Sequence, residues 1–388
     1  MQAITASVQQ VHAAVSDTVF SAARQVPGLA GPTRLARAAH DTIAGGVYGA
    51  IRHGTEAASQ AAGHVERLAQ GPEHTPGATE QAFRSALGGV VGDALLTARS
   101  SLAIDMVLRR GAEPLAITPD SLAVMKPRVC VFVHGLGCNE SSWWRQPEAW
   151  GAAPASRGSA DSNLPVHYGA LLEQESGVSS IFLRYNTGLS INANAAQLAD
   201  LLERVSEAAP QVSEWVLIGH SMGGLLVRGA HDVAVDQRMR WAERAPLLIC
   251  LGSPHRGAPL ERIGRRATQA LASTAITRPL GRLAAARSQG IRDLHDGHRL
   301  APRHNASHAP ALRFVAATLA ADPASLLGKA LSESIGDGLV PTPSATDEGA
   351  AGDVQRVVLA GLNHMDLLNH PRVYEWLRRW VHEREAPH

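Results

Sequence analysis

The sequence WVLIGHSMGGLLV, residues 215–227, contains the pattern Gly-x-Ser-x-Gly between an apolar run and a helical run. Trp215–Ile218 is typical of a buried strand, and the residues after the pattern are typical of a helix. A serine in the tight turn between such a strand and helix exposes its hydroxyl. Gly219 and Gly223 leave room where larger side chains would collide with the neighbouring strand and helix. The stretch therefore predicts that Ser221 is a nucleophile.

A second glycine-rich turn, VFVHGLG at residues 131–137, lies upstream of this motif. An apolar strand that runs into His-Gly-Leu-Gly lets the backbone approach a substrate carbonyl closely. The N–H of Leu136 is therefore one predicted donor to an oxyanion, and the N–H of Met222, at the start of the helix, is the other. The alternative interpretation is an ordinary glycine-rich turn.

A serine hydroxyl needs a base to take its proton, so a histidine is expected downstream. His364 follows the last predicted strand and precedes the terminal helix, as the chain order serine, acid, histidine requires, with His370 as the alternative. Asp337, with a glycine on each side, indicates a sharp loop whose carboxylate orients the imidazole. A simple Asp-Gly turn is the other interpretation of Asp337. The other candidate acids are Asp347, Asp353 and Asp366.

After residue 112, short apolar runs alternate with helical ones, which predicts a mostly parallel sheet with flanking helices. An antiparallel entry hairpin is predicted over 114–125. The predicted strands are 128–133, 179–184, 214–218, 246–251, 312–319 and 355–359. The predicted helices are 192–206, one that begins near Met222, and 371–383. This is the α/β-hydrolase fold class.

Two parts of the chain are predicted to lie outside this core. Residues 1–110 have helical patterns, the last of them over 79–110, and form a predicted helical N-terminal segment. It would pack on the hydrolase domain, 111–388, or alternatively lie on a lipid or polymer surface. Residues 260–308 carry no strand signal and are predicted to be an inserted helical cap or lid.

Composition excludes several function classes. The 388 residues include 36 Lys and Arg against 35 Asp and Glu, which gives no reason to expect a nucleic-acid partner. Three cysteines fit neither a disulfide framework nor a zinc pattern, and Cys130 and Cys250 are predicted to be buried thiols. The histidines between 295 and 308 follow no known ligand spacing, so no metal is expected. Acyl transfer by a serine, a histidine and an aspartate needs no cofactor, so none is expected.

The N-terminal residues lack the basic start of a secretory signal, and no apolar run reaches the ~18–20 residues of a membrane span. We therefore expect a cytoplasmic protein without stable membrane insertion. Its expected partner is a small-molecule or lipid ester. Peripheral lipid contact through the arginines of the predicted lid is left open.

Taken together, these motifs make the sequence resemble bacterial α/β hydrolases related to lipases and to the GPI inositol-deacylase (PGAP1-like) group. The matching segments occur in family order over about residues 112–385: Val133–Gly137, Leu183–Gly188, Gly219–Leu225, Gly252–Leu260, Gly290–Leu294 and Gly336–Pro341. The resemblance implies lipase or esterase activity and supports Ser221, Asp337 and His364 as the triad. It does not cover the first hundred or so residues.

Aromatic and histidine side chains beside the two glycine-rich turns are candidates for the wall of a substrate pocket: His134, Trp143, Trp144 and His220. The two tryptophans could equally anchor a loop to the core. His255 is expected to be structural. The predicted activity is hydrolysis of carboxylic esters through an acyl-enzyme on Ser221. The alternatives are a thioesterase, a polyester hydrolase or an acyltransferase with the same triad, or a mainly non-catalytic scaffold or surface-binding protein.

Overall fold

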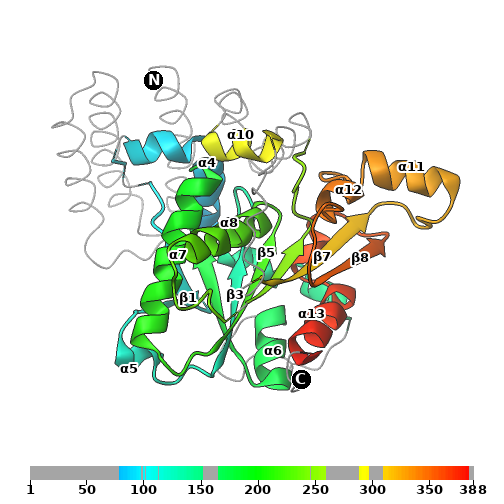
Figure 1. Ribbon diagram of the computed structural model, residues 1–388. Coiled ribbons are helices and arrows are strands. Elements are labelled where there is room, and N and C mark those ends of the chain that lie inside the picture. The colour runs from blue at the N-terminus through cyan, green and yellow to red at the C-terminus, as the bar shows by residue number, and fades with distance from the viewer. Residues whose placement is uncertain are drawn as a thin grey trace, which may run out of the picture. The chain divides into compact units, whose positions relative to one another are not determined.

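A computed structural model of the chain describes residues 78–383, apart from 98, 101, 112, 152–164, 245, 259–287 and 297–308. The chain divides into two units, Met1–Ile104 with Gly264–Gln289, and Asp105–Ile263 with Gly290–His388. The described part of the first unit is largely helix α4, Ala78–Thr97. The second unit contains the sheet and is drawn in Figure 1.

The sheet has eight strands in the order β2-β1-β4-β3-β5-β6-β7-β8. Strand β1 pairs antiparallel with both of its neighbours, and every other pair is parallel. The strands are β1 (Val107–Arg110), β2 (Glu113–Pro114), β3 (Arg128–Val133), β4 (Ser179–Arg184), β5 (Glu214–His220), β6 (Leu247–Leu251), β7 (Ala311–Thr318) and β8 (Val354–Ala360). This confirms the predicted α/β-hydrolase architecture.

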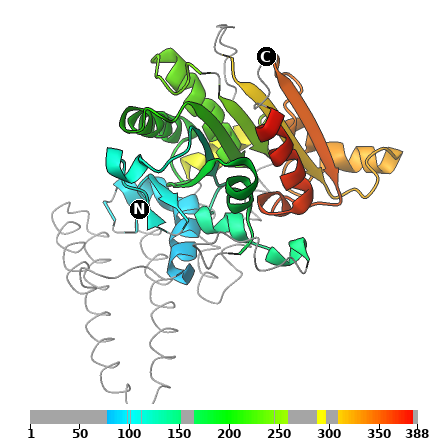
Figure 2. The same cartoon turned by 90° about the horizontal axis from the view of Figure 1, so that it is seen from below.

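The central strands are buried on both faces, which explains why they are continuous apolar runs in the sequence. Alternate residues of β3 enter different cores: Val131 belongs to one cluster and Phe132 to the other. Helices α7 (Ile191–Ala208) and α8 (Met222–Asp236) contribute side chains to the first cluster. Figures 1 and 2 show both helices on one face of the sheet. The opposite cluster is supplied by α6 (Tyr168–Ser176) and α13 (Pro371–Glu383). The helices therefore form one layer on each side of the sheet.

Two cysteines lie within these cores. Cys130 and Cys250 are fully buried, as predicted, and burial raises the pKa of each thiol to about 12. Such thiols stay protonated and behave as small apolar side chains.

Two predictions about the start of the domain were wrong. The helix predicted over 79–110 ends at Thr97, and residues 107–110 form β1, which pairs with β4. Gly111, with φ of 57°, turns the chain into β2, so the entry hairpin lies at 107–114 and not at 114–125. Residues 119–122 form the short helix α5 (Pro119–Leu122), with Thr118 as its N-cap.

Other predictions fall mostly outside the described residues. The first 77 residues and most of the predicted lid, 260–308, belong to this group, and α10 (Gln289–Asp296) is the described part of the lid segment. In the part of the chain that is described, no helix is both long and apolar enough to cross a membrane. The same residues contain no group of three side chains that could hold a metal ion.

The parallel strands determine where the predicted site residues lie. Leu136 follows β3, Ser221 follows β5, Asp337 lies between β7 and β8, and His364 follows β8. Parallel strands point the same way, so the loops that follow them gather at the carboxyl ends of the sheet. Residues that are far apart in the sequence are therefore brought to one side of the sheet.

Candidate active site

Ser221 lies in a sharp turn between β5 and α8. Its φ of 54° and ψ of −122° are rare for a residue with a side chain and indicate local strain. The turn is fixed by two backbone hydrogen bonds, from the Ser221 N–H to the Leu251 carbonyl at 2.8 Å and from the Gly224 N–H to the Ser221 carbonyl at 3.1 Å. The backbone of Ser221 is thus held in this conformation at the start of α8.

The glycines around this turn are required by space. A Cβ atom on Gly219 would overlap the backbone of Gly223, and one on Gly223 would overlap the Val133 carbonyl. On the facing loop, a Cβ atom on Gly135 would come 2.9 Å from the Cβ of Ser221. The predicted steric role of Gly219 and Gly223 is confirmed.

Asp337 and His364 form a buried hydrogen-bonded pair. The Nδ1–H of His364 donates to Oδ2 of Asp337 at 2.7 Å, and Asp337 is fully buried. The other carboxylate oxygen accepts the N–H groups of Leu339 and Val340 at 2.9 and 2.8 Å. Because Nδ1 carries the proton, Nε2 of His364 is left with its lone pair.

Two contacts bring this pair close to the serine. The Nε2–H of His220, next to Ser221, donates to the His364 carbonyl at 2.9 Å. The second contact is at Gly252, next to Leu251, whose carbonyl accepts the Ser221 N–H. A Cβ atom on Gly252 would lie 3.2 Å from both Asp337 Oδ2 and His364 Nδ1. Among the described residues, the Ser221 hydroxyl itself makes no hydrogen bond to His364. Such bonds are often long in unliganded hydrolases and shorten when substrate binds.

The alternative acids and the alternative histidine have other partners. Asp347 pairs with Arg228 at 2.7 Å, Asp353 with Arg313 at 2.8 Å, and Asp366 accepts from Gln146 at 3.1 Å. The Nδ1 atom of His370 accepts the N–H of Arg372. Of the four candidate acids, Asp337 alone hydrogen-bonds to the imidazole of His364.

The two predicted oxyanion donors belong to the two loops that meet at Ser221. Met222 is the first residue of α8, where the N–H has no partner within the helix and the helix dipole favours negative charge. Leu136 lies in the loop after β3, and its N–H donates no hydrogen bond within the described chain. Neither N–H has an acceptor within the described chain, and the role of both groups as oxyanion donors remains a prediction.

The four predicted pocket residues pack mainly among aromatic rings. His134 is stacked on Tyr185 with the ring centroids 4.6 Å apart, and His220 lies against His364 at the same separation. Trp143 is 1% exposed and packs edge-on to Phe132, whereas Trp144 is only partly buried. Trp143 is therefore part of the core. A contact with substrate remains a prediction for all four.

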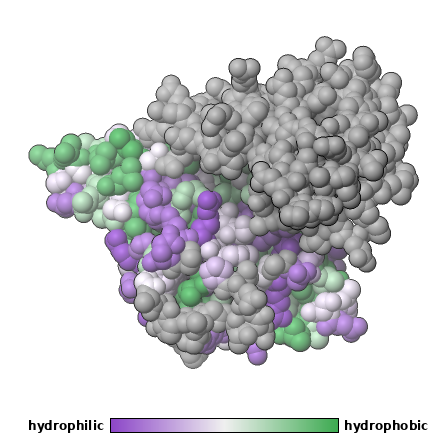
Figure 3. All heavy atoms as spheres, turned by 180° about the vertical axis from the view of Figure 1, so that it is seen from behind, coloured by the Kyte–Doolittle hydropathy of each residue, from purple (hydrophilic) through white to green (hydrophobic). Residues whose placement is uncertain are grey.

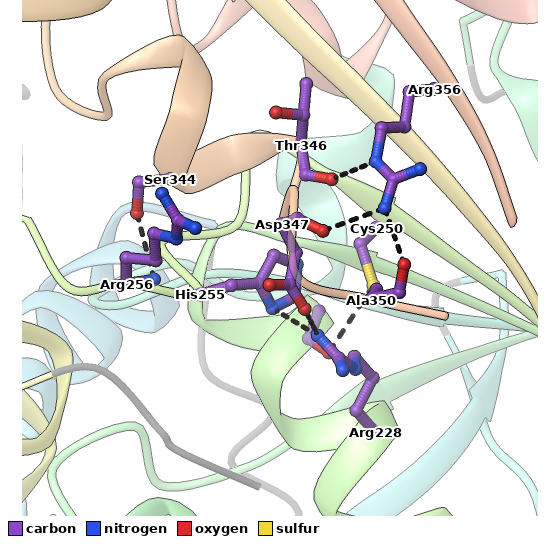
Figure 4. A network of polar contacts seen from close by, with 10 residues as sticks. Arg228, Cys250, His255, Arg256, Ser344, Thr346, Asp347, Ala350 and Arg356 are labelled. Carbon is purple, nitrogen blue, oxygen red and sulfur yellow. Dashed lines mark hydrogen bonds and ion pairs between the residues drawn. The ribbon is translucent and has the colours of Figure 1, made fainter. Parts of the chain in front are cut away.

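An ion network around Arg228 was not predicted from the sequence. Arg228 of α8 donates to Nδ1 of His255 at 2.8 Å and to Asp347 at 2.7 Å (Figure 4). His255 belongs to the loop after β6, and Asp347 follows α12 (Thr342–Ala345), the helix after the Asp337 loop. Ser344 joins the same two segments by accepting the Arg256 N–H at 3.1 Å. The network ties the nucleophile helix to the segment that carries the acid.

Asn369 is another residue that sequence reasoning missed. Its side chain is fully buried and donates to the carbonyls of Arg145 and Val166, each at 2.8 Å. The same amide accepts the indole N–H of Trp150 at 3.2 Å. In the sequence Asn369 precedes His-Pro and gives only a turn signal. In the structure it joins the His364 loop to two distant segments.

Three buried histidines are held neutral. Burial lowers the pKa of His134 to about 4 and that of His167 to about 4. The pKa of His220 is lowered well below its usual value of 6.5, by burial and then by the neighbouring His364. All three rings are therefore uncharged at neutral pH.

We expect the free energy of unfolding to decrease by several kcal/mol between pH 6.5 and pH 4, at ~1.4 kcal/mol for each unit of pKa shift. The unfolded chain binds protons at these histidines from about pH 6.5, but the folded chain does so only near pH 4, so stability rises with pH across this window. Urea unfolding at a series of pH values measures the slope.

His167→Asn is the matched control, because asparagine can still cap α6, as His167 does by accepting the Ala170 N–H. This variant should show a shallower slope than the unsubstituted chain. A stability that stays constant down to pH 5 would contradict the prediction.

Comparison with known proteins places this site in a family. The model of the alpha/beta hydrolase family matches residues 130–375, and no curated protein matches the chain. A lipase from Bacillus licheniformis is similar in structure, with 17% identity and a TM-score of 0.44, over 66% of this chain and 93% of that one. An esterase from Thermogutta terrifontis has 17% identity and a TM-score of 0.39, over 73% and 95% of the two chains. The RedJ thioesterase of Streptomyces coelicolor has 18% identity and a TM-score of 0.38, over 71% and 97%. Since the family model covers more than half of the chain, the protein belongs to the alpha/beta hydrolase family.

Proposed function

We propose that this hydrolase cleaves carboxylic esters through an acyl-enzyme on Ser221, with His364 as the base and Asp337 as the acid. The observation that carries the proposal is the buried 2.7 Å hydrogen bond between Asp337 and His364, beside a serine in a strained turn. An aspartate in this position orients the imidazole and stabilises the imidazolium that forms during reaction.

In the proposed mechanism, Nε2 of His364 takes the hydroxyl proton as Ser221 attacks the ester carbonyl. The N–H groups of Leu136 and Met222 hold the oxyanion of the tetrahedral intermediate. His364 then gives its proton to the alcohol as the bond to the carbonyl carbon breaks. Water, deprotonated by the same histidine, attacks the acyl-enzyme and releases the acid. No cofactor takes part.

The finer substrate class is part of the proposal. The motifs that resemble the GPI inositol-deacylase group support a lipid ester. A second support is helix α11 (Leu326–Ser334), where Leu326 and Leu327 are 92% and 81% exposed. Figure 3 shows apolar side chains gathered over this helix, which ends three residues before Asp337. Exposed apolar patches often mark contact surfaces. A cytoplasmic location remains a prediction.

Hydrolysis of p-nitrophenyl esters from acetate to palmitate, with a matched thioester, tests the proposal. We expect turnover of the oxygen esters and covalent labelling of Ser221 by a fluorophosphonate probe, identified by peptide mass spectrometry. A preference for palmitate supports a lipid substrate, and faster cleavage of the thioester supports a thioesterase instead. If the protein is neither labelled by the probe nor active on any of these substrates, the proposal is wrong and the scaffold alternative is favoured.

A further inference from the structure

The segment that follows β4 contacts the oxyanion loop, residues 134–140, on both sides of Leu136. The hydroxyl of Tyr185 donates to the His134 carbonyl at 2.8 Å. The hydroxyl of Thr187 accepts the N–H of Gly137 at 3.0 Å. These two bonds fix the peptide planes that precede and follow the one containing the Leu136 N–H. The orientation of that N–H is therefore set from outside its own loop.

Ion pairs hold the C-terminal end of the oxyanion loop, at Glu140. Glu140 is 2% exposed and forms ion pairs with Arg184, at the end of β4, and with Arg109 of β1, the latter at 3.0 Å. A carboxylate so deeply buried is stable only when it is paired. Arg184, Tyr185 and Thr187 thus contact the oxyanion loop at three separate places.

The segment itself is buried and held by further hydrogen bonds. Thr187 is 2% exposed and follows Asn186, whose side chain accepts the Gly188 N–H at 3.1 Å. The Asn186 carbonyl accepts from the buried side-chain amide of Asn194 in α7, at 2.9 Å. A Thr187 hydroxyl held in this way gives the Gly137 N–H a fixed acceptor.

Helix α10 holds the other side of this segment. The Gly290 N–H donates to the Gly188 carbonyl at 3.2 Å, and a Cβ on Gly290 would overlap the Thr187 carbonyl. The Asp293 carboxylate accepts the Ile191 N–H at 2.8 Å. These contacts join two segments on which the family resemblance rests, Leu183–Gly188 and Gly290–Leu294, although neither contains a candidate catalytic residue.

We propose that Tyr185 and Thr187 are positioning residues, which hold the oxyanion loop so that the Leu136 N–H faces the reacting carbonyl, and that α10 holds them in place. The expected change in turnover when these residues are replaced rests on the proposed function. The expected change in the conformation of the oxyanion loop does not rest on it, and hydrogen exchange measures that change separately.

Thr187→Val tests the proposal, because valine keeps the shape of threonine and removes the acceptor. We expect a decrease in kcat of roughly tenfold to a hundredfold per probe-titrated site, with KM unchanged, because an oxyanion donor acts mainly in the transition state. Affinity for a trifluoromethyl ketone should fall by the same factor as kcat/KM. Amide hydrogen exchange in the peptide covering 134–138 should become at least about tenfold faster.

Two variants serve as controls. Thr187→Ser keeps the hydroxyl and should restore kcat and the slow exchange. Ser180→Ala removes another buried hydroxyl from the opposite end of β4, where it donates to the Gly169 carbonyl at 3.0 Å, and should leave the oxyanion loop unchanged. If Thr187→Val does not fold, Tyr185→Phe, which removes the bond on the other side of Leu136, gives the same comparison.

The outcomes separate the two proposals. Wild-type exchange and wild-type kcat in Thr187→Val would overturn the positioning role. Faster exchange with an unchanged kcat would also overturn it, because the loop would then move without consequence for turnover. If the unsubstituted chain hydrolyses none of the esters, the proposed function fails, and the exchange measurement still decides whether this segment holds the loop.

Discussion

Ser221→Ala is expected to lower kcat for p-nitrophenyl butyrate by about five to six orders of magnitude, as loss of the nucleophile does in other serine hydrolases. Alanine keeps the strained turn but has no oxygen to form the acyl-enzyme. The residual rate should come from the two oxyanion donors and from substrate binding. Initial rates over a wide range of enzyme concentration measure the decrease, and labelling by the fluorophosphonate probe should disappear.

Ser253→Ala is the matched control. Ser253 is fully buried after β6, and its hydroxyl has no hydrogen-bond partner among the described residues. Its loss should leave kcat within a few-fold of the original value. Activity that survives Ser221→Ala at more than about a thousandth of the original rate would remove Ser221 from the mechanism and return attention to another nucleophile.

Asp337→Asn is expected to lower kcat by about four orders of magnitude. The structure dictates how the asparagine sits, because its Oδ1 atom is held by the N–H groups of Leu339 and Val340. The amide NH2 must then face His364 Nδ1, 2.7 Å away in the unsubstituted chain. Nδ1 has to accept that bond, so the ring proton moves to Nε2, and the atom facing the serine can no longer act as a base.

Asp353→Asn provides the comparison for this variant. Asp353 pairs with Arg313 at 2.8 Å, and the Asp353 side chain is 63% exposed. Because solvent screens such a charge, its removal should change kcat little. Probe labelling and ester hydrolysis should slow together in Asp337→Asn and stay unchanged in Asp353→Asn. A decrease of less than about tenfold in Asp337→Asn would show that another carboxylate orients the histidine.

The buried strands could be predicted because each is a short apolar run between turn residues. The bounds predicted for β3 and β4, and for α13, agree with the structure. Strand β1 could not be predicted in the same way. Its four residues follow a helical pattern, and its local partner β2 is only two residues long, so the strand depends mainly on hydrogen bonds from β4, more than 70 residues later. Local sequence does not contain that partner.

In the candidate site, too, some residues could be predicted from the sequence and others could not. Ser221, Asp337 and His364 were proposed from motif and chain order, and the hydrogen bond between the last two agrees with that proposal. Thr187 lies in the matching segment Leu183–Gly188 and Asn369 gives a turn signal, but neither pattern indicates a role, because each residue acts on the backbone of a segment far away in the sequence. Sequence patterns indicate what a residue can do chemically, but they do not indicate which distant carbonyl or N–H group it will meet.

The short strand β2 has a consequence for how molecules could join. A sheet edge is open to strand addition by a second molecule, but β2 is two residues long and ends in Pro114, which has no N–H to donate. Among the described strands, the sheet can therefore be extended only along β8, which is seven residues long. Two molecules joined there would have β2 at both outer limits. Such a pair would be closed, and a third molecule could not continue the sheet towards a fibre.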